Sequence, residues 1–216
     1  MDVSALELTC ESSLMNTVLI GIDYIVDILD PNKATARSAA HAMARDVIGK
    51  TNRALAIARR RGWLTILVKV GFAKNYVDQP KQSPLFGRLH EYGTFALETP
   101  GTEFHPHLDI KLVDLVFVKP RVSAFYGTGL DAALRARKID RVIIAGVSST
   151  LAVQSAVRDA HDRDYRVMVL EDACAAANEE THRVSMDMLS VMAEITTVDE
   201  IANEPEEKTI ADGIRH

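Results

Sequence analysis

Short runs of mostly apolar residues recur along the chain and are separated by stretches with a different periodicity. Such runs, rich in β-branched residues and bounded by glycine or charged residues, are typical of strands buried on both faces of a parallel sheet. The pattern predicts strands at Thr17–Ile22, Leu64–Val70, Leu115–Val118, Val142–Ala145, Arg166–Leu170 and Glu194–Val198.

Between the predicted strands, apolar residues recur three, four or seven positions apart, as they do on one face of a helix. This spacing predicts a long helix from Ala34 to Gly62 and further helices from about Leu130, Thr150 and Glu179. Strands that alternate with helices of this length indicate an α/β fold with a parallel sheet.

Residues 78–107 follow neither pattern and contain many proline and glycine residues. A segment of this length without regular structure is uncommon as a plain connection, so we expect a functional loop or a lid. Its aromatic residues, with Phe72 and Tyr76 just before it, either contact a ligand or hold the loop on the core. His105 and His107 form a pair split by proline with no third ligand nearby, which favours surface histidines over a metal site.

Composition limits the class of protein and its partners. The 216 residues, 47% hydrophobic and 25% charged, fit one domain over 1–216, with an N-terminal arm (1–16) and a C-terminal tail (203–216) that is frayed or docks on a neighbouring subunit. A net charge of −5 gives no reason to expect a nucleic-acid partner. No segment approaches the roughly 20 apolar residues that span a bilayer, so no membrane partner is expected. Cys10 and Cys174 fit a reducing compartment, and we expect a cytoplasmic protein.

Charged residues stand directly after two of the predicted strands. Asp23 follows the first strand and Lys119 follows the third. Open α/β sheets bind ligands at the carboxyl ends of their strands, where a carboxylate is poorly solvated, so Asp23 is a candidate proton carrier and Lys119 a candidate partner for its charge. The alternatives are an aspartate that caps the next turn and an ordinary solvated lysine. The turn Gly146–Ala152 should line the same crevice.

The stretch Gly127–Ala132 has the form G-x-G-x-x-A, which raises the question of a dinucleotide site. It lies well beyond the end of the preceding strand, and no acidic residue closes the following strand, so the required context is missing. A helix start with Thr128 as N-cap and Asp131 three residues later explains the stretch better. No cofactor is therefore expected.

Three segments resemble the isochorismatase-like (cysteine hydrolase) superfamily. In the first, AGVSSTLAVQSAVRDAHDRDYRVMVLEDACAA is similar to a turn G-V-x-T-x-x-C that precedes a helix and a strand ending in E-D-A, and Ala152 stands at the position of the nucleophilic cysteine. In the second, GIDYIVD at Gly21–Asp27 is similar to V-I-D-M-Q-N-D. In the third, Lys119 and the segment SAFYGTGL at Ser123–Leu130 are similar to a catalytic lysine followed by S-A-F-x-G-T-x-L. The resemblance covers residues 17 to about 201.

The resemblance implies a three-layer α/β fold of Rossmann-like topology, with a six-stranded, mainly parallel sheet and helices on both faces. It implies Asp23 as general acid or base and Lys119 as its electrostatic partner, beside the nucleophile position at Ala152. Residues expected to contact a small-molecule substrate are Val147, Ser148, Ser149, Phe72, Tyr76, Phe125 and Tyr126. The family also implies a non-proline cis peptide near Val147–Ser148 and a homodimer or homotetramer. No metal is expected, because Gly71–Tyr76 lacks the aspartate and histidine ligands of the nicotinamidase branch.

Ala152 leaves three interpretations of function open, since a methyl group cannot attack a carbon atom. The first is an isochorismatase-like hydrolase that works without a cysteine, in which Asp23 protonates the substrate before water adds. The second is a catalytically inactive binding protein of the same fold. The third is a C–N amidohydrolase inactivated by a Cys-to-Ala substitution. The neighbouring hydroxyls of Ser148, Ser149 and Thr150 are expected to cap the following helix rather than to replace the nucleophile.

Overall fold

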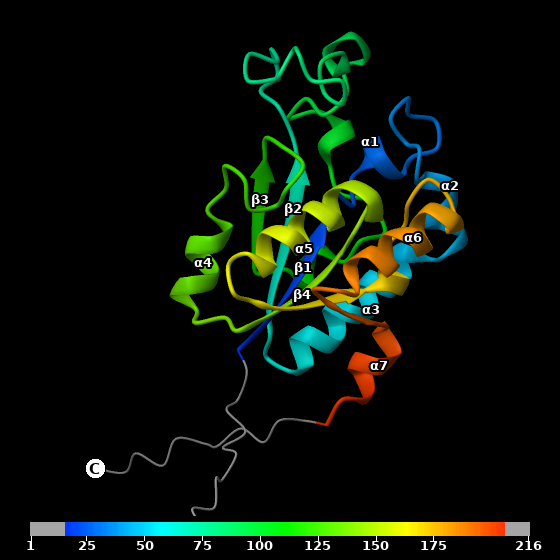
Figure 1. Cartoon of the computed structure of the whole chain (residues 1–216). Helices are drawn as coiled ribbons and strands as arrows, with labels where there is room; N and C mark the ends of the chain where they lie inside the picture. The colour runs from blue at the N-terminus through cyan, green and yellow to red at the C-terminus, as the bar shows by residue number, and fades with distance from the viewer. Residues whose placement is uncertain (1–15, 206–216) are drawn as a thin grey trace, which may run out of the picture.

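A single sheet organises residues 16–205, which are the residues that the computed structural model describes (Figure 1). Its strands are β1 (Thr17–Ile22), β2 (Leu64–Val70), β3 (Leu115–Lys119), β4 (Arg141–Gly146), β5 (Arg166–Leu170) and β6 (Glu194–Thr196). Their order across the sheet is β3-β2-β1-β4-β5-β6, and every neighbouring pair is parallel. The predicted six-stranded α/β sheet is confirmed, and it is wholly rather than mainly parallel.

Helices cover both faces of this sheet. The α-helices are α1 (Val26–Leu29), α2 (Ala39–Ala44), α3 (Val47–Arg60), α4 (Leu130–Ala136), α5 (Gln154–His161), α6 (Glu179–Leu189) and α7 (Val198–Asn203). Helix α3 packs on β1, β2 and α7, whereas α5 packs on β4, β5 and α6. In Figure 1, α5 lies in front of the sheet and α3 behind it. The chain reverses its direction of progress across the sheet between β1 and β4, and in open sheets such a point is where ligands bind.

The long helix predicted from Ala34 to Gly62 is wrong, because the structure contains two helices there. Helix α2 ends at Ala44, and α3 begins at Val47. Between them Asp46 has φ 50°, in the left-handed region that only a few residue types adopt readily. Apolar residues keep helical spacing across the break, so periodicity alone does not reveal it.

Two helix starts also differ from the prediction. Gly129, not Thr128, is the N-cap residue of α4. The Thr128 hydroxyl still accepts from the backbone N–H of Leu130 at 3.3 Å while it donates to the carbonyl of Ala124 at 2.7 Å, and Asp131 accepts from Tyr165 instead of completing a capping box. The helix after β4 begins with the π-helical turn η4 (Ser149–Val153), and the preceding residue, Ser148, makes no side-chain cap. The expectation that hydroxyls of this turn cap the helix is therefore wrong.

The last part of the described chain contains a helix that the apolar pattern missed. Strand β6 ends at Thr196 rather than at Val198, and α7 follows. Thr197 accepts from the backbone N–H of Glu200, while the Glu200 carboxylate accepts from the backbone N–H of Thr197. The sequence T-V-D-E matches this reciprocal capping pattern, which therefore could have located the helix.

Residues 78–107 extend beyond the carboxyl ends of β2 and β3, at the top of Figure 1. They contain the 3-10 turns η1 (Leu89–Tyr92) and η2 (Pro100–Thr102), and two more, η3 (Ile110–Leu112) and η5 (Glu171–Ala173), lie elsewhere. A separate apolar cluster holds this segment on the sheet and consists of Ile25, Val70, Phe72, Phe86, Leu89 and Phe95. The segment is thus pinned by its aromatic residues, and its role as a lid stays a prediction.

Both ends of the described chain are tied to the body of the protein. The Asn16 side chain donates to the carbonyl of Lys138, and the carboxylate of Glu204 pairs with Arg61 and Arg141. The rest of the predicted arm and tail, residues 1–15 with Cys10 and residues 206–216, lies outside the described residues. Within 16–205, no helix is both long enough and apolar enough to cross a membrane.

Candidate active site

Asp23 and Lys119 meet at the carboxyl ends of β1 and β3. The Nζ atom of Lys119 lies 2.7 Å from Oδ2 of Asp23 and donates a second hydrogen bond to the carbonyl of Val122 at 2.6 Å. Asp23 is 4% exposed and Lys119 is 1% exposed. The expected pairing of the two side chains is confirmed as a direct contact, and the pair is almost completely removed from solvent.

The backbone around Asp23 explains how the carboxylate reaches this position. Asp23, the residue after β1, has φ 62°, which turns the chain over the end of β2. The backbone N–H of Asp23 donates to the carbonyl of Val68, and its Oδ1 accepts from the N–H of Val70 at 2.8 Å. Aspartate tolerates the left-handed region better than most residues because its short side chain bonds locally. Both carboxylate oxygens are therefore fixed.

Two opposing effects act on the acidity of Asp23. Burial penalises the charged carboxylate and raises its pKa, while the charge of Lys119 and the hydrogen bonds from Lys119 and Val70 lower it. The effect of burial is the larger, so the pKa of Asp23 lies above its usual range. A carboxyl with a raised pKa can hold a proton at a pH where ordinary aspartates are ionised, which suits proton transfer.

The turn after β4 lies directly beside this pair. The backbone N–H of Val147 donates to the carbonyl of Ile22, the residue before Asp23, at 3.0 Å. The peptide bond Val147–Ser148 is cis, as the resemblance predicted. Gly146 makes the close approach possible, since a Cβ there would lie 2.7 Å from the Ile22 carbonyl oxygen. Ala152 lies in η4 and is buried.

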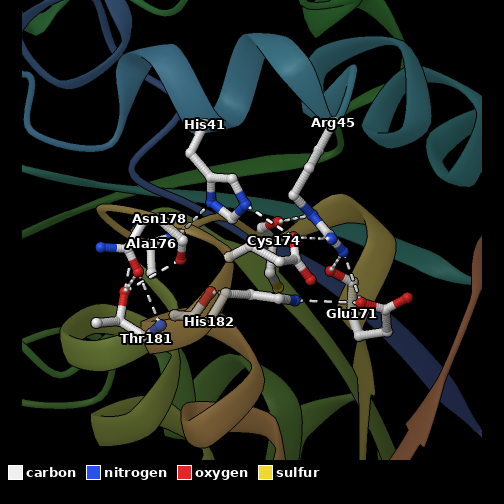
Figure 2. Close-up of polar contacts among 10 residues, drawn as sticks. His41, Arg45, Glu171, Cys174, Ala176, Asn178, Thr181 and His182 are labelled. Atoms are coloured by element: carbon white, nitrogen blue, oxygen red, sulfur yellow. Dashed lines mark hydrogen bonds and ion pairs between the residues drawn. The ribbon is translucent and has the colours of Figure 1, made fainter.

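A polar network behind this turn was not predicted from the sequence. The Ser149 hydroxyl lies 2.7 Å from Nδ1 of His182, and Nε2 of His182 lies 3.1 Å from the carboxylate of Glu171. Arg45 bonds the same carboxylate at 2.6 Å (Figure 2) and also bonds the carboxylate of Glu179. The E-D-A signal marked Glu171, but nothing in the sequence indicated that His182 faces it from α6.

The residues predicted to contact substrate do not form one group. Phe72 is fully buried in the apolar cluster under residues 78–107, with its ring 5.5 Å from that of Phe86, and Tyr76 packs against the same cluster. Phe125 is buried beside Tyr165, and Tyr126 is 60% exposed. Val147 and Ser149 are buried in the turn, while Ser148 is partly exposed. Substrate contact by these seven residues stays a prediction.

A surface cavity of about 650 Å³ lies apart from Asp23 and Lys119, neither of which lines it. Its walls come from α1, α2, the start of α3 and the segment His105–His107. The two histidine rings are 5.5 Å apart, and partial burial, followed by the nearby His107, lowers the pKa of His105. Among the described residues, no group of three histidine, cysteine, aspartate or glutamate side chains is arranged to hold a metal ion.

The structure is thus an open, parallel α/β sheet with a buried carboxylate–ammonium pair at the carboxyl ends of β1 and β3. The family known by its isochorismatase domain matches residues 17–200. The chain therefore belongs to the isochorismatase family, and the resemblance found in the sequence is confirmed.

Known relatives of this chain include hydrolases and one protein named as inactive. It is 32% identical over 155 residues to the ureidoacrylate amidohydrolase RutB of Acinetobacter baylyi, covering 66% of this chain and 63% of that protein. It is 32% identical over 197 residues to an Arabidopsis thaliana protein named "Probable inactive nicotinamidase", covering 88% of this chain and 96% of that protein. A solved isochorismatase family protein from Desulfovibrio vulgaris superposes with a TM-score of 0.77 at 24% identity, covering 87% and 96% of the two chains, and supports the fold.

Proposed function

We propose that this protein hydrolyses a small molecule without forming a covalent enzyme intermediate. The observation that carries the proposal is the buried contact between Asp23 and Lys119. The resemblance to cysteine hydrolases places Ala152, in the neighbouring turn, at the position of the nucleophile. These groups can move a proton and hold charge, but Ala152 cannot attack a carbon atom. The family of hydrolases to which the chain belongs supports the reaction type.

In the proposed mechanism Asp23 acts as the general acid. Its raised pKa favours the protonated carboxyl, which gives its proton to the substrate as the scissile bond is polarised. Water then adds to the electron-poor carbon and gives a proton to the Asp23 carboxylate. The adduct collapses with cleavage of the scissile C–O or C–N bond, and the leaving group departs with the remaining hydroxyl proton of the adduct. Lys119 stabilises the aspartate charge that exists between the two transfers, so the pair is regenerated at the end of the cycle.

The substrate class follows from this chemistry and from the relatives. A vinyl ether fits the acid role of Asp23, because protonation of its double bond gives a cation to which water adds, and the resulting hemiketal then collapses to a carbonyl compound and an alcohol. A primary amide or carbamoyl group is the alternative, since RutB is named for an amidohydrolase reaction. For such a substrate Asp23 would instead act as general base toward water, and the two roles differ in their pH dependence.

The test is a screen of vinyl ethers, primary amides and carbamoyl compounds with the wild-type protein and Asp23→Asn. We expect activity in the wild type and a loss of about 10²–10⁴-fold in Asp23→Asn, the range typical of a missing acid–base group. Quenched reactions analysed by intact-protein mass spectrometry should show no substrate adduct. An adduct on Ser148, Ser149 or Thr150, or full activity in Asp23→Asn, contradicts the proposal.

A second candidate is a binding protein that retains the fold without turnover. Two observations favour it, namely Ala152 at the nucleophile position and the Arabidopsis relative whose name describes it as inactive. This candidate predicts no hydrolysis in the screen together with saturable binding of one of the screened compounds. Asp23→Asn should then change the affinity for that compound, and neither the wild type nor the variant should hydrolyse it.

A further inference from the structure

Every polar group of Ser149 is engaged by the segment between β5 and the middle of α6. Its backbone N–H donates to the carbonyl of Ala175 at 2.7 Å, and its carbonyl accepts from the Ser185 hydroxyl at 2.9 Å. Its own hydroxyl lies 2.7 Å from Nδ1 of His182. Ser149 is fully buried and opens the π-helical turn that contains Ala152, so these three contacts fix where that turn stands.

The direction of the hydrogen bonds in this network can be assigned from its carboxylate. Hydrogen bonds from His182 and Arg45 lower the pKa of Glu171, which keeps this group ionised and able only to accept. In the Nε2–H tautomer of His182 the ring therefore donates to Glu171. Nδ1 is left as an acceptor, and the Ser149 hydroxyl donates to it.

Arg45 holds the carboxylate end of this network. Its guanidinium bonds the Glu171 side chain, the Glu171 carbonyl and the Cys174 carbonyl. Figure 2 shows Arg45 and His41 pointing from the α2 side toward Glu171 and His182. His41 accepts from the N–H of Ala176 and bonds the carboxylate of Glu179. Arg45 thus holds Glu171 in place on the side away from Ser149. With Glu171 held, His182 contacts Glu171 and Ser149 at the same time.

We propose that His182 is a positioning residue, which holds Ser149 and, through it, the turn 147–153 in the geometry of the site. The inference rests on the proposed function for its catalytic meaning, since the turn borders Asp23 through the Val147–Ile22 hydrogen bond. Neither Ser149 nor His182 takes part in proton transfer with the substrate. Their effect is to set where the turn stands relative to the carboxyl.

Two substitutions of His182 separate this role from simple support of the fold. In His182→Asn the side-chain amide occupies the place of Nδ1 and can still accept from Ser149, but it loses Glu171. In His182→Gln the amide occupies the place of Nε2 and can still donate to Glu171, but it loses Ser149. Both variants remove the ring from the same buried position, so loss of packing is comparable in the two.

The experiment is amide hydrogen exchange on the full-length variants, followed by mass spectrometry at peptide resolution. We expect His182→Gln and Ser149→Ala to raise the exchange rate of residues 147–153 by about 3–10-fold, as one hydrogen bond allows. His182→Asn should stay within about two-fold of the wild type in that segment. Peptides of β1 and β2 should not change, and Ser38→Ala, which removes a buried hydroxyl outside the network, is the matched control.

Equal exchange of residues 147–153 in the Asn and Gln variants overturns the proposal, whether both rise or neither does. A rise in exchange throughout the sheet also overturns the proposal, because His182 then supports the whole fold. The exchange result needs no substrate, so it stands even where the proposed hydrolysis fails. Where hydrolysis is found, kcat should fall in His182→Gln and Ser149→Ala and be retained in His182→Asn, with KM unchanged.

Discussion

At the scale of single residues, the contact between Asp23 and Lys119 offsets the free-energy cost of burying each charged group. Each charge is removed from water, and each is compensated mainly by the other and by one backbone hydrogen bond. Removal of either partner alone leaves the other buried without its counter-charge, which typically costs about 3–5 kcal/mol. Activity measurements on single variants therefore need a parallel measurement of folding. Asp23→Asn preserves the shape of the side chain and is the better choice for kinetics.

The pH dependence of kcat/KM should follow the protonation of Asp23. If the carboxyl is the general acid, kcat/KM falls as pH rises through the raised pKa of Asp23, because the proton-donating form is lost. Lys119 lowers this pKa, so in Lys119→Met the fall should move to higher pH. A pH series with both proteins gives the measurement. A rise of kcat/KM over the same range would assign Asp23 as general base.

Cys174 should behave as an inert thiol in the native protein. Burial raises its pKa to about 12, so the reactive thiolate is scarce at neutral pH. In Cys10→Ser, whose remaining thiol is Cys174, the reaction with Ellman's reagent at pH 8 should be about 100-fold or more slower in buffer than in denaturant. Similar rates in the two conditions would show that this thiol is accessible. Cys174→Ser should leave any hydrolysis unchanged.

The sequence identified Asp23 and Lys119 because the end of a strand is a local feature. Each residue follows a continuous apolar run, and parallel strands bring their carboxyl ends to one edge. The partner of His182 depends instead on how α6 packs against β5 and the turn after β4. The burial of Phe72 and Phe125 was also not predictable, since aromatic residues near a loop look alike in sequence whether they are exposed or buried in the core.

At the scale of elements, three helices end in the same way and pass directly into a strand or its approach. After α3, α4 and α5, the chain places Gly62, Lys138 and Asp164 in the left-handed region. In each case the next residue donates back five positions, as Ile139 does to Leu134, and this residue is apolar or aromatic. This is the Schellman ending, in which glycine avoids the steric cost of the left-handed backbone.

Glycine stands at only one of these three endings, which allows a paired test. Lys138→Gly should raise the free energy of unfolding by about 0.5–1 kcal/mol, because Lys138 has φ 50° and glycine removes the clash of its Cβ. Gly62→Ala, at φ 68°, should lower it by about 1 kcal/mol. Urea denaturation of both variants gives the measurement. Changes of the same sign would contradict this account of the helix ends.

Burial explains which elements the sequence could predict. The five longer strands fall within one residue of their predicted limits because β1, β2 and β4 are buried almost throughout and read as continuous apolar runs. The break between α2 and α3 and the cap of α4 were not predictable in this way. They depend on single backbone angles and on tertiary partners such as Tyr165 for Asp131.

At the scale of the whole molecule, the two edges of the sheet are unequal. β6 is a short strand that begins with a charged residue, which is a common protection for an edge. β3 is the other edge, and its side chains Leu115, Val116 and Val118 are 39%, 51% and 40% exposed among the described residues. An apolar edge of this kind is prone to associate with another chain. In the predicted homodimer or homotetramer, another subunit would cover this edge strand.

Val116→Lys should reduce self-association of the protein without disturbing the fold. The substitution adds a charge to an exposed position on the edge strand, where it opposes strand pairing and apolar contact. Sedimentation velocity over a range of concentrations gives the measurement, and Val184→Lys, at an exposed position on α6, is the matched control. Unchanged association in Val116→Lys would place the contact between subunits elsewhere.

The order of the strands also determines when the centre of the protein can form during synthesis. β1 lies between β2 and β4, yet Gly146 at the end of β4 follows Val70 at the end of β2 by 76 residues. At about 5–20 residues per second, a ribosome needs roughly 4–15 s to make that interval. Throughout it, one edge of the apolar strand β1 has no β4 to pair with. The nascent chain should therefore be most vulnerable to aggregation after β2 and before β4 has left the ribosome.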